Sequence, residues 1–454
     1  MAAAPSRLED LKASFSGIVL LPGDSGYDEA RRIHNGLIDK RPAVIALCQN
    51  TPDIRDAINF GRESDLEISV RGGGHNPAGL AVAEGGLMID LSTMKGIHVD
   101  PAGRTAHAQP GVIWNEFNRA TGLHGLAVTG GQISTTGIAG LTLGGGLGWV
   151  MSSYGMAVDN VLSVEIVTAD GEVQRASKDE NPDLFWAVRG GGGNFGVVSW
   201  FEYRLHPLTM VTGGLVTHPF PDAGDMLRFY RDFTTDVGDD LTVFAGIMPA
   251  LDGSGVKLGA MLMCHVGPPD KAQADLEPIL SFGQPVMVEV GPIPYPVMNT
   301  ILDDAFPSGA LNYWKSSFLS GVTDDAIATM VEHSATCPSP MTGVLLEHFH
   351  GEVTRVDPTA TAFPHRERSY NFLIFGQWMD PTTTEDNILW VKETYAAMES
   401  HFGGGRYVNY LSDDEADGSV QDAYGVVYNR LRELKQRYDP HNLFHLNQNI
   451  HPTG

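Results

Sequence analysis

Glycine is concentrated in three clusters in the first half of the chain, and these clusters limit the folds that the sequence can adopt. They are RGGGHN at 71–76, GGQISTTGIAGLTLGGGLGW at 130–149, and RGGGGNFGVV at 189–198. The chain has 53 glycines among 454 residues, about 12% where ~7% is usual. Consecutive glycines let backbone N–H groups approach a ligand without interference from Cβ atoms, and such N–H groups bind anions. The clusters therefore favour a phosphate-bearing ligand, although tight turns in a β-rich domain would also use them.

The third cluster matches the pattern GxGxxG at 191–196, but its context argues against a Rossmann fold. In that fold the pattern follows a strand and opens a helix. Here a helix-like segment, 183–188, precedes it and a strand-like segment, 197–201, follows it. The pattern GxxxxGK[ST] is also absent from the sequence. A nicotinamide dehydrogenase and a P-loop phosphotransferase are both disfavoured.

Charge and cysteine content exclude further classes of function. The 30 Lys and Arg residues against 55 Asp and Glu residues give a net charge of −25, which repels nucleic acid and anionic membrane surfaces. The charged N-terminus does not resemble a signal peptide, and no apolar segment is long enough to span a membrane. Three separated cysteines are too few for a disulfide framework or a zinc cage. We expect a cytoplasmic protein with no nucleic-acid, membrane or metal partner.

The order of predicted elements indicates a mixed α and β protein with more than one domain. Before Pro207, short strands and helices alternate around the glycine clusters; one helix is predicted to start at Thr51 and run to about Gly61. After Pro207 the clusters stop, and long strand-like runs such as 258–266 and 370–378 predict a second domain. Near the C-terminus, apolar residues at helical spacing over 420–434 predict a single helix that stops at Tyr438-Asp439-Pro440.

Several motifs occur together along the chain. They are VRGGGHN at 70–76, TTG at 135–137, LGGGLGW at 143–149, YG at 154–155, DN at 159–160, NPDLFWA at 181–187, RGGGGNFGVV at 189–198, YVNY at 407–410, YDPHNLF at 438–444 and NQN at 447–449. In this order they resemble the FAD-linked oxidases of the vanillyl-alcohol oxidase superfamily, specifically the berberine bridge enzyme-like branch. The motifs span most of the chain, so they are far more specific than one glycine triplet.

The resemblance implies an α+β fold with a two-part FAD-binding domain and a substrate domain whose antiparallel sheet is covered by helices. The FAD-binding domain would occupy 1–208, with its PCMH-type region at about 38–208. The substrate domain would occupy 209–405, and a berberine bridge-like segment, 406–454, would return to the FAD domain. The residues that would contact FAD are Arg71, Gly72, Gly73, Gly74, His75, Asn76, Gly131, Ser134, Thr135, Gly137, Gly140, Gly144, Gly145, Gly146, Gly148, Gly193, Asn194, Gly196, Val197, Asn447 and Asn449.

The family's covalent 8α-histidyl link to flavin maps onto His75. Members with a second link carry a cysteine in the second glycine cluster, at the position that Ile133 occupies here. None of the three cysteines lies near that position in the sequence. We therefore expect one covalent link through His75 and no cysteinyl link.

Two tyrosines match the family's Y-x-N-Y segment beside the flavin, Tyr407 and Tyr410. A tyrosine can remove a substrate proton if a neighbouring cation or hydrogen bond lowers its pKa from about 10. Tyr410 is the preferred catalytic base. Many relatives carry Gln or Glu five residues before the tryptophan that aligns with Trp378, but this chain has Leu373, so their base cannot be transferred directly.

The segment LLEHFH at 345–350 is predicted to be a strand. Alternation along a strand places His348 and His350 on one face and Glu347 on the other. The two histidines are secondary candidates for a catalytic base in a substrate pocket. A metal site would need further ligands that the neighbouring sequence does not supply.

We interpret the chain as an FAD-dependent oxidase of secondary metabolism that oxidises a small cyclic or aromatic alcohol or amine and passes the electrons to O2, which gives hydrogen peroxide. An oligosaccharide oxidase and a flavin dehydrogenase with another acceptor stay open as alternatives. A non-catalytic FAD carrier is a further reading. A monomer or a homodimer is expected.

Overall fold

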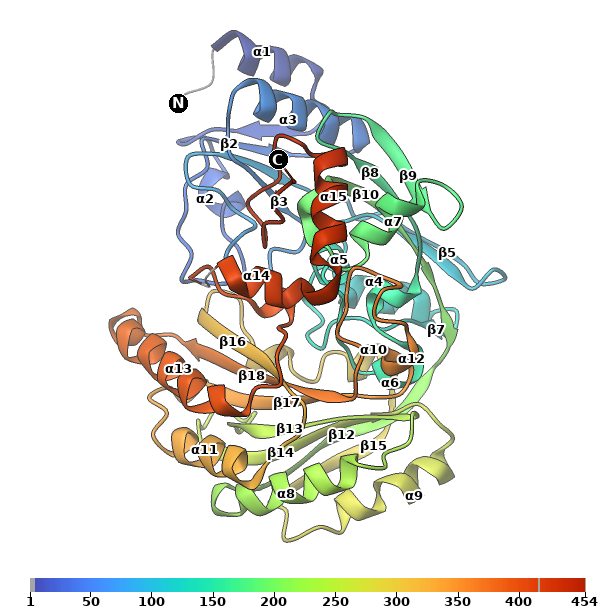
Figure 1. Ribbon diagram of the computed structural model, residues 1–454, viewed down its shortest axis with the longest axis vertical. Coiled ribbons are helices and arrows are strands. Elements are labelled where there is room, and N and C mark those ends of the chain that lie inside the picture. Colours follow the sequence, from blue (N-terminus) through green and yellow to red (C-terminus); the bar gives the residue numbers. More distant parts are fainter. Residues whose placement is uncertain (1–4, 415–416, 454) are drawn as a thin grey trace.

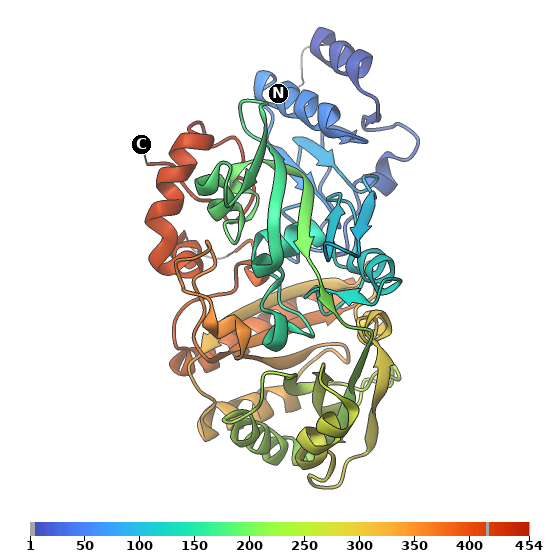
Figure 2. The same cartoon turned by 90° about the vertical axis from the view of Figure 1, so that its right-hand side faces the viewer.

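The computed structural model describes residues 5–414 and 417–453, which form two stacked parts (Figures 1 and 2). The upper part in Figure 1 contains a four-stranded and a five-stranded sheet, and the lower part contains a seven-stranded sheet with helices beneath it. A two-stranded sheet pairs β7 (Leu126–Ala127) with β11 (His206–Pro207). Residues 1–4, 415–416 and 454, which fall in the expected ranges 1–208 and 406–454, lie outside the described residues.

A four-stranded sheet presents the first glycine cluster. Its order is β1 (Ile18–Leu20), β2 (Val44–Leu47), β4 (Leu87–Asp90) and β3 (Ile68–Arg71), and β2, β4 and β3 run parallel. Helix α3 (Thr51–Glu63) connects β2 to β3, and the side chain of Asn50 caps it by accepting a hydrogen bond from the N–H of Asp53. The predicted helix from Thr51 is confirmed. The first glycine cluster follows directly from the end of β3.

The second sheet of the upper part is antiparallel. Its order is β5 (Ile97–Asp100), β6 (Thr105–Ala108), β10 (Val197–Arg204), β8 (Val161–Val167) and β9 (Val173–Ser177). The third glycine cluster lies between helix α7 (Pro182–Val188) and β10, so the helix-before, strand-after context predicted from the sequence is confirmed. This context is the reverse of a Rossmann turn.

The lower part is a seven-stranded antiparallel sheet. Its order is β15 (Met287–Pro294), β12 (Met210–Pro219), β14 (Lys257–His265), β13 (Leu241–Pro249), β17 (Gly343–Phe349), β18 (Ser369–Trp378) and β16 (Leu311–Leu319). Helices α8 (Ala223–Thr234), α9 (Pro269–Leu280), α11 (Asp324–Ala335) and α13 (Thr384–Met398) cover the face that points away from the upper part (Figure 1). The predicted α+β class, with an antiparallel sheet covered by helices, is confirmed.

Shorter elements complete the two parts. They are α1 (Pro5–Ser14), α2 (Tyr27–Ala30), α4 (Trp114–Gly122), β7 (Leu126–Ala127), α5 (Ile138–Leu143), α6 (Met151–Tyr154), β11 (His206–Pro207), α10 (Tyr295–Met298), α12 (Glu352–Arg355) and the 3-10 turn η7 (Val408–Tyr410). Across the described ranges, no helix combines the length and the apolar character needed to cross a membrane.

The C-terminal segment returns to the upper part, where its last helix lies beside α7 (Figure 1). The prediction of one helix over 420–434 is wrong: the structure has α14 (Asp417–Tyr424) and α15 (Tyr428–Tyr438), separated by a 3-10 turn at Gly425–Val427. Gly425 has a φ of 44°, which breaks the helical path. Helix α15 ends at Tyr438, as predicted.

A buried lysine fixes the C-terminal tail to the third glycine cluster. The ammonium group of Lys435 donates hydrogen bonds to the carboxylate of Asp439 at 2.7 Å and to the carbonyls of Asn194 and Phe444 at 2.8 and 3.0 Å. The side chain of Asn194 in turn donates to the carbonyl of Gln448 at 3.1 Å. A buried charge is tolerated when it is paired and hydrogen-bonded in this way.

Candidate active site

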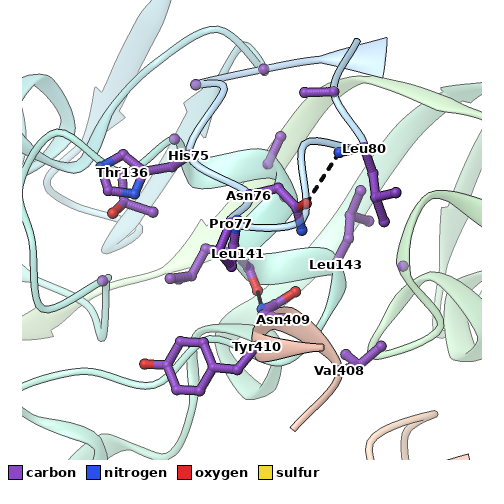
Figure 3. A pocket seen from close by; sticks show the side chains of 18 of the residues that line it. His75, Asn76, Pro77, Leu80, Thr136, Leu141, Leu143, Val408, Asn409 and Tyr410 are labelled. Carbon is purple, nitrogen blue, oxygen red and sulfur yellow. Dashed lines mark hydrogen bonds between the residues drawn. The ribbon is translucent and has the colours of Figure 1, made fainter. Parts of the chain in front are cut away.

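A cavity lies between the upper part and the large sheet, and loops of the three glycine clusters form one of its walls. We call this the glycine wall. Figure 3 shows His75 beside Thr136, and Asn409, which donates a hydrogen bond to the carbonyl of Leu141 in the second glycine cluster, next to Tyr410. The expected FAD-contacting residues that line the cavity are Gly72, Gly73, Gly74, His75, Asn76, Gly131, Gly137, Gly140, Gly193, Asn194, Gly196, Val197 and Asn447.

Much of the glycine wall is backbone. A Cβ atom on Gly73 would lie 2.5 Å from the Cα and N atoms of Gly137, so two of the clusters approach too closely for any side chain. Within the described residues, none of the N–H groups of residues 72–76 donates a hydrogen bond to a backbone carbonyl. Successive N–H groups left free beside a cavity form a site for an anion such as a diphosphate.

His75 stands in this wall with its imidazole fixed. Its Nε2 atom is hydrogen-bonded to the hydroxyl of Thr135 at 3.0 Å. Burial, and secondarily the neighbouring His34, lower the pKa of His75 to about 3. The imidazole is therefore neutral at physiological pH and keeps a nitrogen lone pair that can form a bond.

Other residues expected to contact FAD do not line the cavity. They are Arg71, Ser134, Thr135, Gly144, Gly145, Gly146, Gly148 and Asn449. Arg71 donates to the carbonyl of Ala30 and pairs with Asp90, and Ser134 donates to the carboxylate of Asp303 through both its N–H and its hydroxyl. A Cβ atom on Gly148 would lie 1.8 Å from the carbonyl oxygen of Gly130. These residues support the wall from behind, because the chain packs against itself there.

The large sheet, together with the segment that leads from α10 to β16, forms the opposite wall, which we call the sheet wall. Its apolar side chains are Met248, Leu262, Leu302, Phe306, Trp314, Leu345, Leu373 and Phe375, and Ile133 adds to them from the second glycine cluster. Cys48, Cys264 and Cys337 are not among the lining residues. Leu373 is one of the apolar residues that line the cavity.

A buried carboxylate lies next to the sheet wall, outside the residues that line the cavity. Glu347 on β17 is fully buried, and it accepts hydrogen bonds from the amides of Gln132 at 2.5 Å and Asn371 at 2.6 Å. The hydroxyl of Tyr410 donates to the same carboxylate at 3.2 Å. Desolvation raises the pKa of Glu347 to about 7, although the three donors oppose this shift. The carboxyl group can therefore take up or release a proton near neutral pH.

Both candidate tyrosines line the cavity, but the pKa of each is raised, so neither meets the condition of a lowered pKa for a tyrosine base. Burial raises the pKa of Tyr407 to about 12. Burial and the neighbouring charge of Glu347 raise the pKa of Tyr410 well above its usual value. The hydroxyl of Tyr407 accepts hydrogen bonds from the N–H of Gly146 and the amide of Asn409, so it holds the tail against the second glycine cluster.

His348 and His350 do not line the cavity. They lie on the other face of β17, with ring centroids 4.4 Å apart, and His348 stacks on Tyr370 at 4.8 Å. Burial lowers the pKa of both imidazoles. Their predicted role as bases in the substrate pocket does not match this position, because the face that they share packs against the covering helices.

Glu347, Gln132 and Asn371 could not be identified as site residues from the sequence. The one sequence feature that pointed toward Glu347 is the alternation along 345–350, which places Glu347 on the opposite face of the strand from the two histidines. Which face of the strand meets the cavity depends on how the sheet packs against the upper part, and periodicity does not specify that packing. Gln132 is 215 residues away from Glu347 in the sequence.

The comparisons with known proteins agree with this geometry. Residues 42–177 match the FAD binding domain family, and residues 406–451 match the berberine and berberine-like family. The chain is 32% identical over 458 residues to (R)-6-hydroxynicotine oxidase from Paenarthrobacter nicotinovorans, with 97% of this chain and 98% of the relative covered. The chain belongs to the berberine bridge enzyme-like FAD-linked oxidoreductases.

Two further similarities support this assignment. The crystal structure of 6-hydroxy-D-nicotine oxidase from Arthrobacter nicotinovorans superimposes with a TM-score of 0.87 at 29% identity, covering 96% of this chain and 98% of that one. The carbohydrate oxidase of Microdochium nivale is 26% identical over 477 residues, with 95% of this chain and 92% of the relative covered. The resemblance seen in the sequence motifs is thereby confirmed, and the oxidoreductase is an enzyme that uses FAD.

The cavity of the oxidoreductase fits this cofactor. Gly140 lines the cavity, and a Cβ atom placed on it would meet no other atom within 4 Å, so the wall opens into free space there. The glycine wall offers the free N–H groups that a diphosphate needs, and the apolar sheet wall suits a flat ring system. The residues that would hold FAD are those of the glycine wall together with Asn447 and Gln448 from the tail.

Proposed function

We propose that the oxidoreductase is an oxidase that removes a hydride from a small cyclic or aromatic alcohol or amine. When bound, FAD supplies the hydride acceptor and transfers the electrons to O2, which gives hydrogen peroxide. The observation that carries the proposal is the arrangement of the two walls: an apolar sheet wall faces the glycine wall, and the polar pair Tyr410 and Glu347 lies at its edge.

Tyr410 and Glu347 form the path for the substrate proton. Glu347 is absent from the cavity lining, whereas Tyr410 lines the cavity and donates to the Glu347 carboxylate. Tyr410 would accept the O–H or N–H proton of the substrate while its own hydroxyl proton moves to Glu347. This relay needs no tyrosinate, which agrees with the raised pKa of Tyr410. Tyr410 is the catalytic residue, and Glu347 acts through it.

The lining of the sheet wall favours an aromatic or aliphatic ring over a sugar. Eight apolar side chains form it, and no lysine or arginine lines the described cavity. An oligosaccharide would leave most of its hydroxyl groups without a hydrogen-bond partner against such a surface. The nicotine-type relative is named for an aromatic cyclic amine, and a substrate of this kind agrees with the wall better than the carbohydrate of the other relative.

A single covalent bond to flavin through His75 belongs to the proposal. Its support is the position of His75 in the cavity, the neutral state that burial gives its imidazole, and the presence of Ile133 where a cysteinyl link would require a thiol. We predict that flavin stays with the polypeptide after acid precipitation of the wild type and is released from His75→Ala. Free flavin in both samples would refute the covalent link while leaving FAD binding intact.

An oxygen-electrode screen with peroxide detection tests the reaction. Cyclic amines and phenolic or benzylic alcohols are expected to drive oxygen uptake with one peroxide formed per oxygen consumed, and cello- or chito-oligosaccharides are expected to be inert. Faster turnover with oligosaccharides would favour the sugar oxidase. Flavin reduction without oxygen uptake would indicate a dehydrogenase, and flavin that no substrate reduces would indicate a carrier. The monomeric or dimeric state and the cytoplasmic location stay predictions.

A further inference from the structure

A second histidine lies directly against His75. The imidazole rings of His34 and His75 are stacked, with centroids 3.7 Å apart and an interplanar angle of 21°. His34 belongs to the segment between α2 and β2, outside residues 42–177 that match the FAD binding domain family. Its Nε2 atom is buried and has no hydrogen-bond partner among the described residues. The ring of His34 therefore contributes to this contact through its flat face.

The position of His34 is fixed from two sides. Its N–H donates to the carbonyl of Gly74 at 3.0 Å, and its own carbonyl accepts from the N–H of Gly309 at 2.9 Å. The side-chain amide of Asn35 donates to the carbonyls of Pro77 and Asn312 at 2.7 and 2.9 Å. The segment thus ties the loop that carries His75 to the start of β16, and the stack cannot shift without breaking these bonds.

The stack and Thr135 together define the orientation of the His75 ring. One ring face meets His34, and the hydroxyl of Thr135 contacts Nε2, so rotation of the imidazole is blocked. The same packing partly buries the His34 ring, and burial lowers the pKa of His34 to about 4. Arg71, the charged residue at the base of the loop, is directed to the carbonyl of Ala30 and to Asp90. His34 is therefore the titratable side chain that faces His75.

We propose that His34 is a positioning residue for covalent flavin attachment, because its ring holds the His75 imidazole in the orientation from which a nitrogen bonds to the 8α carbon of the flavin. This inference rests on the proposed His75 link. The step forms one C–N bond and breaks one C–H bond of the 8α methyl group and the N–H bond of the imidazole. The two electrons and two protons reduce the flavin, and O2 then takes them to give hydrogen peroxide.

The test compares four full-length proteins: wild type, His75→Ala, His34→Ala and His34→Phe. Total FAD per polypeptide is measured before denaturation, and covalent FAD is measured from flavin fluorescence of the denatured band. We expect His34→Ala to bind FAD but to carry at least fivefold less covalent flavin than the wild type. His34→Phe is expected to restore most of the attachment, because a flat apolar ring preserves the stack and the exclusion of water.

The pH dependence separates positioning from a general loss of structure. Each flavin-free protein is incubated with FAD between pH 6 and 8, and attachment is followed over time. In His34→Ala, water reaches His75 and its pKa returns toward the usual value of about 6.5, so attachment slows as the pH falls. The wild type and His34→Phe are expected to attach flavin at nearly the same rate over this range.

Three results would overturn the inference. Equal covalent flavin in the wild type and both His34 variants would show that the stack has no role. Loss of attachment in His34→Phe as well as His34→Ala, with normal FAD binding, would show that a nitrogen of His34 is needed and not its ring face. A wild type without covalent flavin would refute the His75 link itself, and the inference with it.

Discussion

The two walls of the cavity achieve their shape in different ways. Much of the glycine wall is backbone, and its geometry depends on the absence of side chains where Gly73 meets Gly137. The sheet wall is made of side chains, most of which project from strands of an antiparallel sheet, and Glu347 and Asn371 of that sheet form a polar group with Gln132. We therefore propose that the glycine wall holds the cofactor, and that the sheet wall selects the substrate and accepts its proton.

This difference predicts two kinds of mutational effect. Damage to the glycine wall should remove the cofactor, because the backbone has no freedom to accommodate a Cβ atom. Changes in the sheet wall should leave the cofactor in place and alter the rate or the pH dependence of the reaction. The following experiments test this division.

Gly73→Ala is expected to have the largest effect. Its new Cβ atom would lie 2.5 Å from the backbone of Gly137, so the two clusters must move apart, at a cost of about 1–3 kcal/mol of folding free energy. We expect loss of most bound FAD and a lower Tm. Gly238→Ala is the matched control, because a Cβ atom there meets nothing within 4 Å. Normal FAD content in Gly73→Ala would contradict the assignment of cofactor binding to the glycine wall.

Asn371→Leu is expected to shift the pH dependence of turnover without loss of FAD. Asn371 donates a hydrogen bond that stabilises the ionised form of Glu347, so its removal raises the pKa of that carboxyl group further above its ordinary value. The rate of flavin reduction by substrate should rise with pH as Glu347 ionises, and the midpoint should move upward by about one pH unit. An unchanged midpoint would show that Glu347 does not control the rate.

His348→Phe is expected to have the smallest effect on catalysis, within about twofold of the wild-type rate. His348 lies on the helix-covered face of β17, and its folded pKa is lowered by burial. Between the unfolded pKa near 6.5 and the lower folded value, the unfolded chain binds more protons, so the wild type loses stability as the pH falls through this window. His348→Phe should retain more of its Tm at pH 5, as thermal unfolding at pH 5 and pH 8 would reveal. A large loss of turnover would show that His348 takes part in catalysis.

The sequence predicted the glycine wall better than the sheet wall, and the reason is physical. The motif residues of the glycine wall act through local backbone conformation, so the sequence of a short segment such as 71–76 is enough to predict its place in the site. Glu347 acquires its role only when β17 pairs with β18 and the sheet packs beneath Gln132. Alternation identified which residues share its face, but no local pattern identified the neighbours of that face.

The C-terminal segment and Tyr410 illustrate the same limit. Helical spacing predicted the apolar stripe over 420–434, but Gly425 divides the segment into two helices because its φ is positive. Tyr410 was selected from its motif, whereas the carboxylate beside it, which raises its pKa, comes from a strand 63 residues earlier. The position of Tyr410 in the site was predictable from the motif, but the direction of its pKa shift was not.

The most direct test of the account is the anaerobic rate of flavin reduction, measured by stopped flow in the wild type and in Glu347→Gln with a substrate from the oxygen screen. We predict full covalent flavin in both proteins, a rate about 100-fold lower in Glu347→Gln, and an ionisation near pH 7 in the wild type that is lost in the variant. Equal rates with the same pH dependence in the two proteins would contradict the proton path from Tyr410 to Glu347.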